Sequence, residues 1–127
     1  MNARELKRFE KKLLDERGKL LKQLGSRAEF LFHKTQKDSA GDLSAYSYHM
    51  ADLGTDAMER EKEFLMASVE GKMVQEIDDA LRRVHSKTYG KCELCEGKIS
   101  KERLDIVPNA RLCIQCQEKE DEREGVS

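Results

Sequence analysis

Tryptophan is absent from this chain of 127 residues, and proline occurs only once. The sequence also lacks a run of about 18 apolar residues, which is the length that a membrane helix needs. A positively charged start followed by an apolar stretch, as in a secretory signal, is missing as well. These absences predict a soluble, cytoplasmic protein with no membrane partner.

Charged residues make up 39% of the chain and hydrophobic residues 38%, a balance too polar for an ordinary globule of this length. Such a composition is typical of long solvated helices that each bury one narrow apolar stripe. The formal net charge is -1, so the whole molecule has no general attraction to nucleic acid or to an anionic membrane.

The first segment, residues 2–37, has the heptad spacing of a coiled-coil helix. Leucines recur at intervals of seven at Leu6, Leu13 and Leu20. Two glycines weaken this helix, each by about 1 kcal/mol relative to alanine. The interleaved positions are Glu10, Arg17, Leu24 and Leu31, and the residues expected to widen the stripe are Leu14, Leu21 and Ala28.

A second helix is predicted over residues 55–86, after a polar, turn-like segment. Asp52 or Thr55 can cap its start, and Gly90 can supply a left-handed cap where it ends. Neither helix can bury its stripe alone. The predicted apolar face of this second helix consists of Met66, Val69, Met73, Ile77, Ala80 and Val84.

The simplest way to bury both stripes is to fold the two helices against each other. We therefore predict an all-α fold, with a long antiparallel two-helix coiled-coil hairpin over residues 1–87 and its tip at about 38–56. A small C4 zinc-finger module with a short C-terminal helix follows at 88–127. A helix of about 32 residues is roughly 48 Å long, so we expect a long finger with its tip far from the cysteines.

All four cysteines fall in one C-terminal stretch, as two C-x-x-C pairs. The pairs are separated by 17 residues, a spacing expected for a four-cysteine zinc site. A two-residue gap lets both thiolates of a pair face one point, and two pairs complete a tetrahedron about 2.3 Å from the metal. In a reducing cytosol, such cysteines indicate metal rather than disulfides. We predict one structural Zn²⁺ ion on Cys92, Cys95, Cys113 and Cys116.

Free thiols, a redox pair and an iron–sulfur cluster are the alternatives for these cysteines. Four thiolates leave no position for water, so the predicted zinc site is structural and not catalytic. Few apolar residues lie between the pairs, so metal binding should supply most of the folding free energy, on the order of 10–16 kcal/mol. Lys91, Lys98 and Arg111 are candidates to offset the negative charge of the site.

The segment around the cysteines resembles the zinc finger of the DksA/TraR family. The matching residues are 89–95, Ile99, 101–104, Pro108, 110–113 and Cys116. Residues 49–56 resemble the hairpin tip of DksA-like members, and Glu76, Ile77, Ala80 and Leu81 match the run that leads to the finger. The resemblance covers about residues 49–120, and the first helix matches only in character.

This resemblance implies a non-enzymatic transcription regulator that binds bacterial RNA polymerase. In the family, the hairpin enters the secondary channel and acidic tip residues approach the active site. A carboxylate there can pair with basic groups or perturb magnesium coordination. Asp52 and Asp56 are the corresponding candidates in this chain.

Two departures from the family pattern affect these expectations. The well-studied DksA tip has two aspartates three apart and an alanine two after the second, whereas here the aspartates are four apart and Met58 stands at the alanine position. The basic residues of the family's alarmone site fall on Glu76, Val107 and Gln117, none of which is basic. This substitution argues against a ppGpp response through that site.

Plainer interpretations remain for several of these residues. Asp52 and Asp56 can simply start and cap the second helix. The group Tyr46, Tyr48, His49 and Met50 can contact a polymerase or form a local apolar plug. His33 and His85 are expected to be solvated or packed, because four cysteines already satisfy the metal.

Two other functions remain open from the sequence. A zinc finger that binds nucleic acid directly is disfavoured, since its basic residues alternate with acidic ones and no aromatic platform is present. A structural coiled-coil adaptor that dimerises through its leucines is the other, although the intramolecular hairpin predicts a monomer. No nucleophile–base pair, phosphate loop or open metal site suggests an enzyme. Neither target promoters nor the direction of regulation follows from the sequence.

Overall fold

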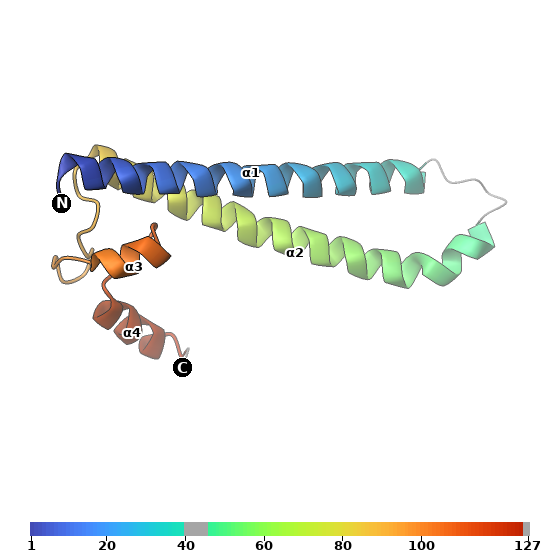
Figure 1. Cartoon of the computed structure of the whole chain (residues 1–127). Helices are drawn as coiled ribbons and strands as arrows, with labels where there is room; N and C mark the ends of the chain where they lie inside the picture. Colours follow the sequence, from blue (N-terminus) through green and yellow to red (C-terminus); the bar gives the residue numbers. More distant parts are fainter. Residues whose placement is uncertain (40–45, 126–127) are drawn as a thin grey trace. The chain divides into compact units, whose positions relative to one another are not determined.

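The computed structural model describes the backbone of residues 1–39 and 46–125, and the side chains of residues 1–32 and 56–125. The chain forms two long helices followed by two short ones (Figure 1). In the described residues, the only extended pairing is an isolated antiparallel bridge between Lys91 and Lys98. The predicted all-α class is therefore confirmed. The helices are α1 (Ala3–Ser39), α2 (Tyr46–His85), α3 (Lys101–Ile106) and α4 (Ile114–Arg123).

The chain divides into two compact units, which are described separately below. The finger unit consists of Met1–Gly18 and Gln75–Ser127, and the central unit is Lys19–Val74. The start of α1 and the end of α2 thus group with the cysteine-bearing segment. The predicted division at residue 88 stays a prediction. As far as the structure describes them, none of the helices has the length and apolarity that a bilayer crossing needs.

Helix α1 begins with a reciprocal cap that its sequence encodes. The Asn2 side chain accepts a hydrogen bond from the Glu5 backbone N–H at 2.8 Å, and the Glu5 carboxylate accepts one from the Asn2 N–H at 3.3 Å. This capping box satisfies two donors that a helix start leaves without a partner.

The core of the finger unit joins both long helices to the cysteine-bearing segment. Its fully buried apolar side chains include Phe9 and Leu13 from α1, Ile77 from α2 and Leu104 from α3. The Phe9 ring lies 5.7 Å from the Tyr89 ring, measured between centroids. Residue 9 on α1 therefore lies beside residue 89, while Arg17 pairs with Asp78, so the two helices are antiparallel in this unit.

Tyr89 anchors the segment that leaves α2. Its hydroxyl donates a 2.7 Å hydrogen bond to the Pro108 carbonyl, and both groups are buried. Burial raises the pKa of Tyr89 to about 12, because the charged phenolate is disfavoured away from water. This contact holds the segment before the first cysteine pair against the segment before the second pair.

The central unit buries a narrower and more polar seam. Leu31 and Val74 are buried in it together with Glu70, and Leu20 and Leu24 are half-buried. Of the predicted widening residues, Leu21 and Ala28 are exposed in this unit, and Leu14 is exposed in the finger unit. The seam is therefore held by a single row of side chains on α1.

The predicted apolar face of α2 is wrong over the central unit. Met66, Val69 and Met73 are exposed, with 49% of Val69 open to solvent. The physical reason is that Arg27 of α1 occupies a seam position and pairs with Glu63 and Glu70. Carboxylates therefore take the inward positions, whereas in the finger unit Ile77, Ala80 and Val84 are buried as predicted.

The predicted start of α2 and the residue predicted to cap its end also need correction. The helix begins at Tyr46 rather than near residue 55, so Asp52 and Thr55 lie within it and do not cap it. No proline interrupts this stretch, and the one glycine costs only about 1 kcal/mol. At the other end α2 stops at His85, and Lys87 takes the left-handed conformation expected of Gly90.

Gly90 is left-handed too, with φ 84°, but it serves the next segment rather than ending the helix. Its carbonyl accepts a hydrogen bond from the Ile99 N–H at 2.8 Å. A Cβ atom at this position would lie 2.9 Å from Cε of Met1. The left-handed backbone favours glycine here, whereas the flexible Met1 side chain could move aside.

Candidate metal centre

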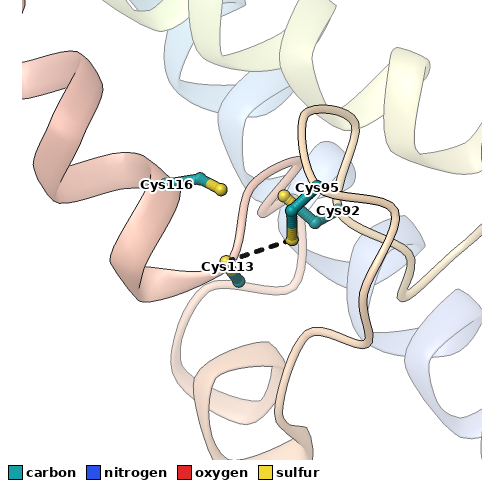
Figure 2. Close-up of side chains that lie close together, drawn as sticks. All are labelled: Cys92, Cys95, Cys113 and Cys116. Atoms are coloured by element: carbon teal, nitrogen blue, oxygen red, sulfur yellow. Dashed lines mark hydrogen bonds between the residues drawn. The ribbon is translucent and has the colours of Figure 1, made fainter.

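The four cysteine sulfur atoms converge on one point of the finger unit (Figure 2). All four Sγ atoms lie within 4.8 Å of one another, and none is in a disulfide. The Cys95 and Cys113 sulfur atoms are 3.8 Å apart. A zinc ion bound tetrahedrally at about 2.3 Å separates its sulfur ligands by about 3.8 Å, so this donor set fits the metal.

The first C-x-x-C pair sits on a tight turn that aims both sulfur atoms the same way. The Cys92 N–H donates to the Gly97 carbonyl at 2.8 Å, and Glu96 takes a left-handed conformation with φ 62°. The Gly97 N–H then donates to the Cys95 sulfur at 3.4 Å. A backbone donor of this kind stabilises the thiolate form that a metal requires.

The second pair is positioned by the start of α4. Cys113 is the N-cap of this helix and Cys116 lies in its first turn, which brings both sulfur atoms to the same end. The predicted short C-terminal helix begins at Ile114, so its first turn is part of the cysteine site itself.

Backbone donors and burial set the charge state of the cysteines. Burial on its own raises the pKa of the Cys92 thiol, but the backbone N–H groups of Cys95, Cys113 and Leu94 overcome it and lower the pKa to about 6. The pKa of the Cys116 thiol is raised to about 12 by a hydrogen bond with Cys113 and by burial. The Cys92 sulfur is therefore favoured as a thiolate, whereas the Cys116 sulfur is favoured as a thiol.

Hydrogen bonds outside the cysteines tie the two pairs together. The Glu93 N–H donates to the Arg111 carbonyl at 3.0 Å, and Nε of Arg103 donates to the Leu112 carbonyl at 3.0 Å. Helix α3, which carries Arg103, is capped by Ser100 and buries Leu104 completely. The cysteine geometry thus rests on a packed support rather than on the turns alone.

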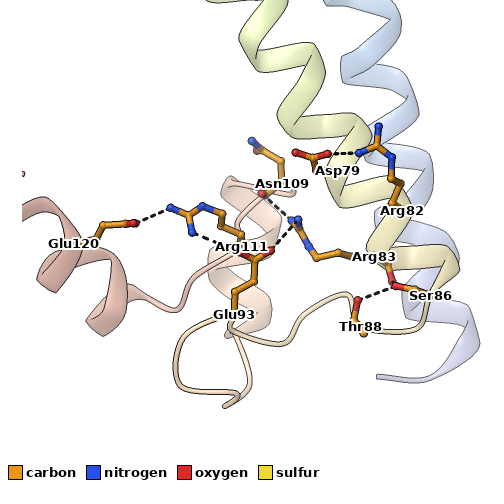
Figure 3. A network of polar contacts seen from close by, with 9 residues as sticks. All are labelled: Asp79, Arg82, Arg83, Ser86, Thr88, Glu93, Asn109, Arg111 and Glu120. Carbon is orange, nitrogen blue, oxygen red and sulfur yellow. Dashed lines mark hydrogen bonds and ion pairs between the residues drawn. The ribbon is translucent and has the colours of Figure 1, made fainter.

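A chain of charges surrounds this support (Figure 3). Arg83, near the end of α2, pairs with Glu93 at 3.6 Å and donates to the Asn109 carbonyl at 3.2 Å. Arg111 pairs with Glu93 at 3.5 Å and with Glu120 of α4 at 2.7 Å. Of its members, Arg111 was expected to offset the charge of the metal site but pairs with Glu93 and Glu120 instead. The other charged members are scattered over 38 positions and resemble ordinary surface charges in the sequence.

The start of α1 is clamped to α3 by further ion pairs. Glu5 pairs with Lys101 at 2.6 Å, and Asp105 pairs with Arg8 at 3.1 Å and with Lys12 at 3.3 Å. These groups are mostly solvent-exposed, so water and salt screen each pair and its net contribution to stability is small. These pairs orient α3. The buried side chain of Leu104 contributes more to stability than they do.

The other candidate residues belong to the central unit or lie apart from the sulfur atoms. Asp56 is half-buried on α2, whereas Asp52 and the group Tyr46, Tyr48, His49 and Met50 lie outside the described side chains. His85 is exposed in the last turn of α2, which is the solvated one of its two predicted alternatives, and His33 lies outside the described side chains.

Comparison with known proteins agrees with this geometry. Residues 87–122 match the family described as the prokaryotic dksA/traR C4-type zinc finger. The chain is 30% identical over 125 residues to an uncharacterized protein of Aquifex aeolicus, covering 98% of this chain and 82% of that protein. Together with the sulfur cluster, the family match supports one structural zinc ion as the cofactor.

Two named proteins are similar over nearly the whole chain. The RNA polymerase-binding transcription factor DksA of Caulobacter vibrioides is 29% identical over 126 residues, covering 99% of this chain and 82% of that protein. The structure of transcription factor DksA2 from Pseudomonas aeruginosa superimposes with a TM-score of 0.81 at 27% identity, covering 98% and 88%. With its C4 cysteine site, its helices and these relatives, the chain belongs to the DksA/TraR family of C4-type zinc-finger proteins.

Proposed function

We propose that this protein is a non-enzymatic transcription regulator that binds bacterial RNA polymerase. The observation that carries the proposal is the likeness to a protein named an RNA polymerase-binding transcription factor, which extends over 99% of this chain. The likeness includes both long helices as well as the cysteine site, so it is more than a shared zinc finger.

Cys92, Cys95, Cys113 and Cys116 hold the structural zinc ion in this proposal. The metal supplies a cross-link between the turn after α2 and the start of α4, and four thiolates leave it no open position for water. Glu93 and Arg111 also join the two halves of the site, through a backbone hydrogen bond and an ion pair. The finger then acts as a rigid base for the helices.

Asp52 and Asp56 are the residues that we assign to the action on the polymerase, through the secondary channel. They lie four residues apart on the continuous helix α2, and positions with this spacing share one helical face. Two carboxylates on one face can approach a magnesium-dependent site together. The two aspartates are spaced differently from those of DksA, and Met58 stands at the alanine position. We therefore predict that their effect on transcription differs in strength from that of the DksA tip.

Direct binding of nucleic acid by the finger is the weaker alternative. A finger that holds phosphates needs basic side chains that are available to them. Arg83 and Arg111 are instead engaged by Glu93, and Arg111 also by Glu120. A mobility shift with free DNA that weakens steeply with salt would favour this alternative.

An alarmone response through the family's site is not part of this proposal. Glu76 accepts a hydrogen bond from Asn109 at 3.2 Å, and the Gln117 amide donates to Asp121 at 3.0 Å. The third position, Val107, is half-buried and apolar. These groups supply no positive charge for a polyphosphate.

The experiment that tests the proposal is a pull-down of core bacterial RNA polymerase by the zinc-loaded protein. We expect one-to-one capture of a monomer, with the mass measured in solution. The double variant Asp52→Asn with Asp56→Asn should still bind but lose its effect on transcription. Glu61→Gln, an exposed change on the same helix, is the matched control and should keep both. No capture of polymerase would refute the proposal.

A further inference from the structure

The most deeply buried charge in the described part of the chain is Glu70, on the central part of α2. Only 5% of this residue is exposed. Arg27 of α1 donates from Nε to one Glu70 oxygen and from Nη1 to Glu63 at 2.5 Å. One arginine thus bridges two carboxylates that lie seven residues apart, with Ala67 between them on the same face.

This network is poorly suited to increase stability. The second oxygen of Glu70 is buried with no hydrogen-bond partner in the described residues. Removing a carboxylate from water carries a penalty that a single arginine offsets only in part. Apolar residues of similar volume in the same places are often as stable or more so. Another property of the network must therefore account for its place in the seam.

The neighbouring seam positions indicate what that property is. Leu24 and Leu31 lie one turn before and one turn after Arg27 on α1, and both are at least half-buried. If α1 slipped by one turn along α2, one of these leucines would replace Arg27 beside Glu70. Glu70 would then be a buried carboxylate without a cation, which strongly disfavours the slipped form.

The other residues of the central seam do not distinguish the native register from one slipped by a turn. It consists of leucines at heptad spacing on α1, so a slipped pairing again sets leucine against α2. Several large apolar residues of α2 in this unit are exposed and take no part in it, including Leu65 and Val69. Leucine packing alone therefore specifies the register weakly.

We propose that the Arg27–Glu63–Glu70 network fixes the register of α1 against α2 in the central unit. It acts by making the one-turn slips costly rather than by adding stability to the native pairing. A slipped form is expected to be disfavoured by on the order of a hundredfold or more, which is the effect of leaving a buried charge unpaired.

The test is an amide NMR spectrum of the zinc-loaded protein with Arg27→Leu, Glu63→Gln and Glu70→Leu combined. We expect a second set of resonances at about 10% or more of the total, confined to residues of the central unit. The melting temperature should hold or rise. The control, Asp79→Asn with Arg82→Gln, removes an exposed pair within α2 and should give a single set.

Two results would overturn this inference. A single set of resonances from the folded triple variant would mean that the register is fixed without these charges, by leucine packing or by the finger-unit core that joins the same two helices. An unfolded triple variant would mean that the network is required for stability. Both results are independent of whether the protein binds RNA polymerase.

Discussion

The two units of this chain are stabilised by different means. The finger unit completely buries large side chains from three helices, among them Phe9, Leu13 and Leu104, and adds a four-cysteine metal site. Among the described side chains of the central unit, those of Leu31, Val74 and Glu70 are buried. One pair of helices can therefore be held together by a buried apolar core in the finger unit and aligned by charged residues in the central unit.

The largest expected effect that separates the units is that of metal removal. Stripping zinc with a chelator should unfold the cysteine-bearing segment, because metal binding supplies on the order of 10 kcal/mol to such sites. The central unit contains no zinc ligand and should keep its helices. Hydrogen exchange checks this: residues 88–125 should lose protection while residues 19–32 and 56–74 retain it. Simultaneous loss in both units would contradict the comparison.

A cavity in the finger core is the next largest effect. Leu104→Ala empties a fully buried site and should cost about 3–5 kcal/mol of unfolding free energy. Leu65→Ala, on the exposed face of α2 in the central unit, is the matched control and should cost less than about 1 kcal/mol. Denaturant unfolding measures both. Equal costs would show that the exposed face is packed in solution.

The smallest effect is the loss of one hydroxyl. Tyr89→Phe leaves the buried Pro108 carbonyl without its donor and should cost about 1–2 kcal/mol at neutral pH. The Tyr89 pKa is raised from 10.0 to about 12 in the folded state, so the native protein loses this contribution as the pH rises from 10 to 12. The stability difference between the two proteins should therefore shrink over that interval. A constant difference would mean that the hydroxyl is not buried as described.

The zinc finger was predictable because its information is local. Two C-x-x-C pairs at the right spacing indicate a metal site whatever the rest of the fold does. The helical class was predictable for a similar reason, since heptad leucines such as Leu13 repeat within a single segment. Where the physics is contained in a short stretch of sequence, the prediction and the structure agree.

The inward face of α2 was not predictable from α2 alone. Its apolar residues, including Met66 and Val69, suggest one face, but the buried one carries Glu63 and Glu70. The deciding residue is Arg27, which lies on the other helix and 43 positions from Glu70. The start of α2 at Tyr46 is not evident from the sequence, because the polar residues before it resemble a turn, although no proline ends a helix there.

The central claim is that α2 brings the carboxylates of Asp52 and Asp56 to RNA polymerase, where they alter transcription. The most direct measurement is the lifetime of an open promoter complex in vitro, with and without the zinc-loaded protein. The account predicts that the native protein and Glu61→Gln change this lifetime, while Asp52→Asn with Asp56→Asn binds the polymerase and leaves the lifetime unchanged. An equal change in lifetime from the double variant would contradict the account.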